Sequence, residues 1–480
     1  MPPCAMCASR VPILSAIVMV LALAGTGCAA LRSYDMELSD TLSLASSGQL
    51  DAAIGNLKSR GKGTKRDLLH YCELGELLRL NGRIAESQKE WRSADATVQA
   101  WENTARSDPA KLLAGIAAYA VNEKLRPYEG HDYEKVMLTT RIALNHLALG
   151  DWDNARVEIK KTHEREAVIA ALRARQLEDI ERDAKSRGAK TQYREVNGYP
   201  VATLETPEVA ALRNGYQSAF SHYLAGFVYE ALGEPGLAAA GYRQAIELQP
   251  NQPLLERALE ELDRRQGIVD NGHTDLLVVI ESGLAPARQS RGFNLPIISS
   301  NDMVLVPVSF PVLRPTEAAL LPDSIEIDGA GAFSVIPITS IDAMARRALQ
   351  DDMPGIMLRG IIRSTVKGAM QRRARKHDSG GLSELAVTLG ALLTESADER
   401  GWRTLPAHIA IARGRVPSGQ QRLRIPTARG METVEVNLAG PHAVVSLRLL
   451  GGRVFAVPAA QDAGRTARIE STPLITHALW

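Results

Sequence analysis

Residues 226–250 read GFVYEALGEPGLAAAGYRQAIELQP and decide the fold of the first half of the chain. Two helical segments flank the turn glycine Gly233, and a proline stops the second segment. Gly226 and Ala238 are small where the two helices of a hairpin would touch closely, and Tyr242 fills the space beside them. The stretch therefore predicts an α-helical hairpin.

Similar turns occur earlier in the chain, each a glycine between two helical patterns: Gly48, Gly82 and Gly150. The spacing from Gly48 to Gly82 equals one period of the tetratricopeptide repeat, and the spacing from Gly82 to Gly150 equals two periods. On this periodicity the chain resembles that repeat over residues 35–265. The resemblance implies stacked helix pairs with a concave groove that binds partner segments. A non-repeating α-helical bundle is the alternative.

One helix of this region is expected to be unusually long. The pattern that begins at Asp151 continues to Gly188, and its apolar residues beyond Thr162 form one narrow seam. Such a helix is not stable alone in water, so its seam must dock on the protein or on a partner.

From about Thr274 the pattern changes to short β-rich segments bounded by Gly, Pro or Asp, including DLLVVIE, MVLVPVSFPVL, HIAIARGRV and AVVSLRLL. Helical patterns lie between them at 340–350, 354–376 and 382–393. The predicted fold class is α+β. An all-α repeat domain at 35–265 precedes a mixed α/β domain at 274–480, in which helices cover a sheet or sandwich.

A short leader precedes the helical region. Arg10 is followed by an apolar run at 11–24, which is too short to span a bilayer comfortably and is typical of a secretory signal. The small residues Gly-Thr-Gly then lead directly into Cys28. This junction resembles the lipobox of bacterial lipoproteins, although Gly25 stands where leucine is usual. An ordinary cleaved signal with a chance cysteine is the alternative.

The lipoprotein resemblance implies removal of residues 1–27, diacylation of Cys28 and a short tether at 28–34. Several acyl chains would anchor the protein in the membrane without a spanning helix. Ala29 stands where Asp would favour the inner membrane of a Gram-negative cell. We therefore expect a lipid-anchored protein of the outer membrane that faces the periplasm.

Composition excludes some partners and bonds. The net charge is +1, so no global field attracts nucleic acid. Cys4 and Cys7 leave with the leader and Cys28 carries lipid, so only Cys72 remains and no internal disulfide is expected.

No catalytic motif in the sequence has its required partners. Ser364 and Lys367 match Ser-x-x-Lys, but no Lys-Thr-Gly follows them. His163 begins a HERE segment that lacks the second histidine of a His-Glu-x-x-His zinc site. Without cysteine pairs or clustered histidines we expect no catalytic residue, metal site or cofactor. The alternative is a cell-wall or peptide hydrolase with its site in the carboxy-terminal domain.

Two segments are candidate binding surfaces. RPYEGHDYEK at 126–135 gathers aromatic and polar groups, so we expect a partner-binding patch there, with a packed capping loop as the alternative. Its proposed contact residues are Tyr128, His131 and Tyr133. QRRARKH at 371–377 could hold anionic headgroups or peptidoglycan, although basic residues also suit a helix carboxyl end. Its basic residues are Arg372, Arg373, Arg375 and Lys376.

Several longer motifs point to the cell envelope. PYEGHDYEKV, LGDWDNARVEIKK, MPGIMLRGIIR and ADERGWRTLPAHIAIAR resemble an uncharacterised bacterial family of tetratricopeptide-repeat lipoproteins. The resemblance implies a periplasmic or envelope protein partner, with the peptidoglycan-synthesis machinery as a candidate. We therefore expect a protein-binding scaffold or assembly factor that acts through its repeat groove.

Overall fold

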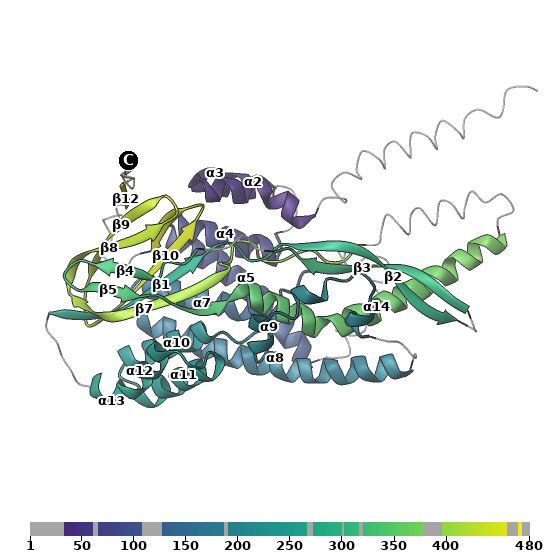
Figure 1. Cartoon of the computed structure of the whole chain (residues 1–480), viewed down its shortest axis with the longest axis horizontal. Helices are drawn as coiled ribbons and strands as arrows, with labels where there is room; N and C mark the ends of the chain where they lie inside the picture. The colour runs from purple at the N-terminus through teal and green to yellow at the C-terminus, as the bar shows by residue number, and fades with distance from the viewer. Residues whose placement is uncertain are drawn as a thin grey trace, which may run out of the picture.

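The computed structural model describes residues 33–60, 66–107, 127–186, 191–265, 272–299, 302–315, 320–377, 396–457 and 469–472. Helices come first in the chain and sheets follow, so the fold is α+β as predicted (Figure 1). Cys28, the leader and the predicted helix at 382–393 lie outside the described residues.

Consecutive helices of the first half form antiparallel hairpins. The pairs are α2 (Tyr34–Ser46) with α3 (Leu50–Arg60), α4 (Leu68–Leu80) with α5 (Ile84–Ser107), α7 (Asp132–Ala148) with α8 (Trp152–Ser186), and α10 (Ala219–Ala231) with α11 (Pro235–Leu248). The predicted turn glycines Gly48, Gly82, Gly150 and Gly233 have φ values of +85°, +72°, +74° and +71°. Only glycine adopts this left-handed backbone without strain, which explains its place in each turn.

Shorter elements fill the remainder of this half. The turns η2 (Tyr193–Glu195) and η3 (Val201–Thr203) and the helix α9 (Pro207–Ala211) connect α8 to α10. After α11 the chain forms α12 (Pro253–Glu260) and α13 (Leu262–Arg265).

In two hairpins the first helix has a glycine where an aromatic ring of the second helix packs against it. A Cβ on Gly75 would collide with the Trp91 indole, and a Cβ on Gly226 would lie 2.5 Å from the Tyr242 ring. The spacing along the chain from the glycine to its aromatic partner is identical in the two hairpins. The backbone of Gly226 also approaches Gly241, whose own Cβ would lie 2.7 Å from the Gly226 nitrogen. Gly226 therefore meets Gly241 and Tyr242 across the hairpin. The predicted partner Ala238 is buried, but the small residue that approaches Gly226 most closely is Gly241.

The second half of the chain forms two main sheets. The first sheet, which we call sheet 1, has the order β11 (Arg453–Val457), β10 (His442–Leu450), β1 (His273–Ser282), β7 (His408–Pro417), β6 (Ile336–Ser340). Sheet 2 has the order β12 (Ile469–Thr472), β9 (Gly430–Leu438), β8 (Gly419–Thr427), β4 (Ser324–Ile327), β5 (Gly331–Ser334). The central strand β1 is parallel to β10 and antiparallel to β7.

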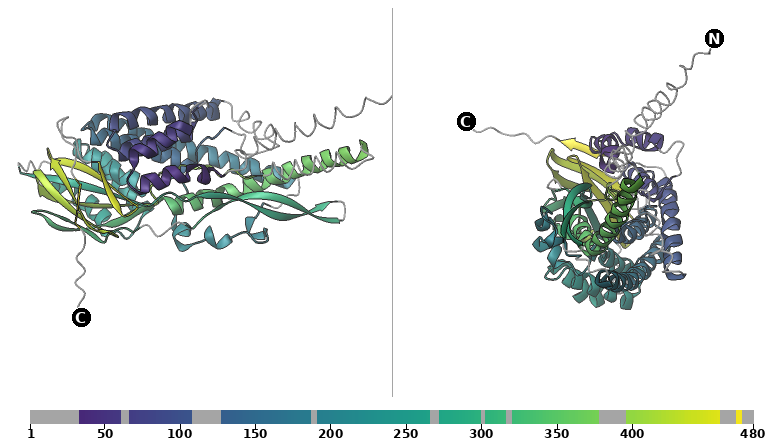
Figure 2. Two further views of the ribbon diagram at one scale, coloured as in Figure 1. Left: turned by 90° about the horizontal axis from the view of Figure 1, so that it is seen from above. Right: turned by 90° about the vertical axis from the view of Figure 1, so that its right-hand side faces the viewer.

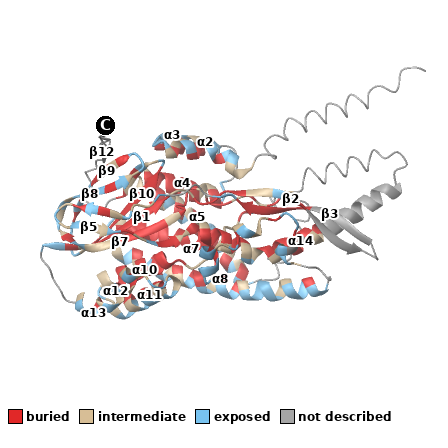
Figure 3. Ribbon diagram, viewed as in Figure 1, coloured by how far each residue is buried: buried red, intermediate tan, exposed pale blue. Residues whose placement is uncertain are grey.

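Sheet 1 is the middle of three layers. Because side chains alternate along a strand, Leu276, Val278 and Ile280 of β1 face sheet 2, where they join a core with β4, β8 and β9. The intervening Leu277 and Val279 face the helices and belong to a core that includes α4, α7 and α10. Buried residues accordingly run from the helices into the sheet without a break (Figure 3).

A long hairpin and a long helix extend towards one end of the molecule, beside the far half of α8 (Figures 1 and 2). The hairpin is β2 (Arg288–Ser299) with β3 (Asp302–Leu313), and the helix is α14 (Ile341–His377). The sequence predicts two helices separated near Pro354, but α14 continues through this proline. Met353 and Met357 are buried on either side of it, so tertiary packing holds the helical path.

The apolar seam of α8 docks on the protein itself except at Leu177, which is exposed. Ile169 and Leu172 are buried, and the Ile180 side chain lies against Gly355 of α14. An ion pair of 3.1 Å between Arg173 and Asp352 adds a polar contact between the same two helices.

Candidate functional site: the polar seam between helices and sheet

The first helices of the second, third and fourth hairpins, α4, α7 and α10, face sheet 1 instead of solvent. Every residue of α7 from 133 to 147 is buried, and both α4 and α10 are buried along most of their length. The surface expected to form an open groove is therefore filled by the second half of the same chain. This corrects the expectation of a free groove: strands β1, β6, β10 and β11 cover the face that a partner segment would need.

Two buried glutamates hold the segment that leads into β7. The Glu73 carboxylate accepts hydrogen bonds from the backbone N–H groups of Arg403 at 2.7 Å and Thr404 at 2.9 Å. The Glu134 carboxylate accepts a bond from the Trp402 N–H at 2.7 Å. Residues 402–404, which we call the clamped segment, are thus fixed to α4 and α7 through their backbone.

Burial raises the pKa of both carboxyl groups. It raises the pKa of Glu73 to about 7, although the hydrogen bonds from Thr404 and Arg403 act to lower it. Burial also raises the pKa of Glu134, against the opposing effect of the Tyr128 hydroxyl and the backbone donors. The clamped segment therefore depends on carboxylates that are costly to ionise.

The structure brings Tyr128, His131 and Tyr133 together but places them inside the protein. Both tyrosines are buried, and both hydroxyls donate to Glu134. The His131 ring stacks on Tyr133 with centroids 5.7 Å apart, and the Arg288 guanidinium lies 2.7 Å from its Nε2 atom. Burial, followed by the charge of Arg288, lowers the pKa of His131 to about 3.

These three residues therefore do not form the partner-binding surface expected from the sequence. The chain's own residues occupy the positions that a partner would need, because Arg400 covers Tyr128 at 5.2 Å from its ring centroid and also offers a carbonyl oxygen to His131. The packed capping loop, which was the alternative, describes the arrangement.

A charged network lies in the interface between the helices and sheet 1, which we call the polar seam. Arg141 of α7 lies between Glu76 of α4, at 3.6 Å, and Glu281 of β1, to which it donates a hydrogen bond. Beside it, Arg79 donates to Asn145 at 2.5 Å and to Ser446 of β10 at 2.9 Å. Fully buried ion pairs of this kind add little net stability compared with apolar packing, but removal of one partner is strongly destabilising.

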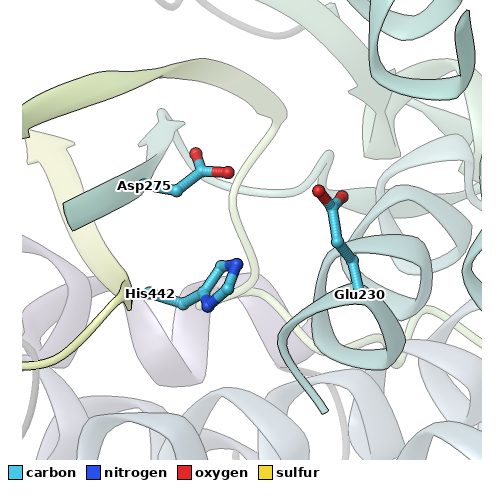
Figure 4. Close-up of side chains that lie close together, drawn as sticks. All are labelled: Glu230, Asp275 and His442. Carbon is cyan, nitrogen blue, oxygen red and sulfur yellow. The ribbon is translucent and has the colours of Figure 1, made fainter. Parts of the chain in front are cut away.

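A second polar cluster lies at the edge of the seam, where solvent reaches part of it. Glu230 of α10, Asp275 of β1 and His442 of β10 point towards a common space (Figure 4). One ligand atom from each lies within 4.8 Å of the others, a spacing that could hold a metal ion. As whole residues all three are half-buried, but the Glu230 and Asp275 side chains are only 5% and 13% exposed.

Two arginines already neutralise this edge cluster. Arg413 of β7 donates to Asp275 at 2.5 Å and to Glu230 at 3.0 Å, and Arg265 donates to the other Glu230 oxygen at 2.5 Å. Burial alone would raise the pKa of Glu230, but these arginines outweigh it and lower the pKa. Burial also lowers the pKa of His442, which keeps it neutral. A cation would therefore have to displace Arg413, so the residues present fit a closed ion-pair cluster better than a metal site.

Arg413 is the centre of the edge cluster and was missed by sequence reasoning. Besides its two carboxylate partners it donates to the Tyr242 hydroxyl at 2.8 Å and lies 4.8 Å from the Phe227 ring centroid. It thereby connects the last helical hairpin to sheet 1. No local motif marks it, since its partners are far away in the sequence.

The other predicted site residues give less information. Arg372, Arg373, Arg375 and Lys376 lie in the last turns of α14, where the structure describes the helix but not the side chains. Cys72 is buried in α4. Among the described residues, no helix is both long and apolar enough to cross a membrane.

Comparisons with known proteins add little to this geometry. No protein-family model matches the chain, and no curated protein matches it. One solved structure that it is similar to is the crystal structure of a tetratricopeptide repeat protein from Parabacteroides merdae. The match has 14% sequence identity and a TM-score of 0.14, and it covers 48% of this chain and 98% of that chain.

Proposed function

We propose that this protein is a lipid-anchored scaffold of the bacterial cell envelope, held in the outer membrane through Cys28 and facing the periplasm, where it binds a protein partner. The observation that carries the proposal is the series of helix hairpins, two of which share a glycine–aromatic register, because stacked helix hairpins serve mainly for binding. The lipobox-like junction before Cys28 supports the anchor.

The partner surface must differ from the filled groove. The second helices of the hairpins keep an outer face, and exposed large apolar side chains there are candidates for contacts. Two such residues are Val157 of α8 at 55% exposure and Leu237 of α11 at 46%, and Leu149 in the turn before α8 is 52% exposed. A 2.9 Å ion pair between Arg156 and Glu234 joins these hairpins beside Val157 and Leu237. We assign the partner contact to this outer face.

The ion pairs of the edge cluster favour a binding function over a hydrolytic one. A general base or a metal-activated water at Glu230 or Asp275 would need a carboxylate free of strong partners. Arg413 and Arg265 already occupy those oxygen atoms.

The test combines fractionation with partner capture. Cys28→Ser should move the protein from the membrane to the soluble fraction, and continued flotation with outer membranes would refute the anchor. A second variant carries Leu149→Ser, Val157→Ser and Leu237→Ser. It should lose an envelope protein that the wild type retains from solubilised membranes, while its melting temperature stays unchanged.

The matched control for the second variant is Leu177→Ser. Leu177 is exposed to 50% and lies near the far end of α8, away from the two hairpin turns. It should capture the same protein as the wild type. Equal capture by the triple variant would show that the outer face is not the binding surface.

A further inference from the structure

We propose that the bilayer lies against the α2 side of the molecule, so that the last helical hairpin and the edge cluster around Arg413 point away from the membrane. This inference rests on the proposed lipidation of Cys28. It names the lipid surface as the partner of one specific side of the protein.

The start of α2 is fixed to the body of the protein. The Tyr34 hydroxyl donates to the buried Glu73 carboxylate at 3.2 Å. The Asp35 carboxylate accepts from Arg403 at 2.8 Å and from Arg314, at the end of the long hairpin, at 3.3 Å. Because Glu73 also holds the clamped segment, the first turn of α2 is tied to α4, to β3 and to the segment before β7.

The chain between the lipid and this fixed point is short. Ser33 caps α2 by accepting from the Met36 N–H, and it is the fifth residue after Cys28. A segment of this length reaches at most about 18 Å even when fully extended. Since α2 begins on contacts with the folded core, this limit applies to the whole body and not to a mobile arm.

The first turn of α2 carries an exposed apolar side chain that could contact a membrane. Met36 in this turn is 60% exposed, so it offers an apolar side chain on this side of the molecule. An apolar side chain so close to the tether can enter the interfacial region of a bilayer, where its burial is favourable.

The opposite side of the molecule carries the last hairpin. In Figure 1 α2 lies along the top and α11, α12 and α13 lie along the bottom, and the end-on view of Figure 2 shows the same separation. Glu230 of α10 belongs to that hairpin, so the edge cluster lies on its side of the seam. Leu237 of the proposed partner surface is also there, so the orientation presents it to the aqueous compartment.

The experiment measures energy transfer from two positions to the bilayer. Full-length protein is purified as the lipoprotein in a Cys72→Ala background and placed in phosphatidylethanolamine–phosphatidylglycerol vesicles that carry an acceptor dye on the headgroups. A donor dye is attached at Met36→Cys in one sample and at Leu237→Cys in the other. Both positions are exposed. We expect several-fold higher transfer efficiency from position 36 than from position 237.

A tether variant tests the cause of the orientation. Insertion of a flexible Gly/Ser linker of about 20 residues after Ala30 should lower the transfer from position 36 towards that from position 237. Vesicle-bound protein with equal transfer from the two positions, or with transfer unaffected by the linker, would overturn the orientation. Failure of the wild type to carry lipid or to bind vesicles would instead refute the lipidation of Cys28.

Discussion

The Glu134 carboxylate accepts a hydrogen bond from the backbone N–H of Trp402 at 2.7 Å, across 268 residues of sequence. The same carboxylate also accepts from the Tyr128 hydroxyl and the His131 N–H. One buried side chain of α7 thus satisfies donors from the loop before it and from the segment before β7. It thereby connects the two halves of the chain at the side where the first hairpins meet the sheet.

Removing the Glu134 carboxylate should destabilise both the loop before α7 and the clamped segment before β7. Glu134→Ala leaves four donors without this acceptor, and three of them are buried: the Tyr128 and Tyr133 hydroxyls and the Trp402 N–H. Each buried donor left unpaired costs about 1–3 kcal/mol, so we expect a loss of at least about 3 kcal/mol in the free energy of unfolding. Hydrogen exchange should rise first at residues 402–404. Glu178→Ala on the exposed face of α8 is the control, and an equally small effect in both variants would contradict the clamp.

The helix contact at Gly226 gives a steric prediction. Gly226→Ala places a methyl group 2.5 Å from the Tyr242 ring and should cost about 1–3 kcal/mol through overpacking. The control is Gly236→Ala in the same hairpin, where a Cβ meets no atom within 4 Å. That change should be neutral or stabilising by up to about 1 kcal/mol, because alanine favours a helix. Thermal unfolding of the two variants separates the cases, and similar melting temperatures would contradict the close contact.

Glu73 gives a prediction about pH. Its pKa of about 7 in the folded protein is above its ordinary value of 4.5, so between these values the folded state binds a proton that the unfolded state has lost. Its contribution to stability is therefore greatest below about pH 4.5 and is lost as the pH rises through 7. Relative to Glu73→Gln, wild-type stability should fall by about 3 kcal/mol between pH 4.5 and 7.5.

Denaturant titrations of both proteins across this range give the difference directly. The comparison with the glutamine variant removes the contribution of His131, whose lowered pKa acts in the opposite direction between pH 3 and 6.5. A difference that increases with pH would show that the hydrogen bonds to Glu73 outweigh its burial.

The edge cluster yields a prediction about metal binding. In a variant that combines Arg413→Ala with Arg265→Ala, the carboxylates of Glu230 and Asp275 lose the arginines that hold them. With His442 they then present three ligands that suit Zn²⁺. We expect Zn²⁺ to raise the melting temperature of this variant and to leave that of the wild type unchanged. Adding His442→Ala to the variant should abolish the increase. An equal increase in the wild type would mean that the two arginines do not close the site.

The parts of the fold that the sequence predicts depend on short-range patterns. Gly233 and the pair Gly226 and Tyr242 lie within one hairpin, so a repeated local register is enough to identify the helices. The alternating apolar residues of β1 and β7 predict strands for the same reason. Their assembly into a sheet that fills the repeat groove could not be predicted, because it joins segments far apart in the chain.

In the candidate site, too, local groupings could be predicted but contacts between distant segments could not. The spacing of Tyr128, His131 and Tyr133 identifies them as a cluster, but their burial depends on Arg400 and Arg288, which the sequence does not place nearby. Aromatic residues serve equally well in interfaces and in cores, so composition alone could not decide between the two. Arg413 resembles any other strand arginine until the topology brings Glu230 and Asp275 to it.

The parallel pairing of β1 with β10 joins an early strand of sheet 1 to a strand that is synthesised much later. Asp275 pairs with His442, although β2 to β9 and the whole of α14 lie between them in the chain. All of the helical hairpins therefore leave the ribosome before β10, one of the strands that cover them, has been synthesised. During that interval the apolar and charged inner face of α7 is open to water and to neighbouring chains, which is a hazard for aggregation and a reason for slow maturation. Correct folding of the helical half thus depends on the strands that are synthesised last.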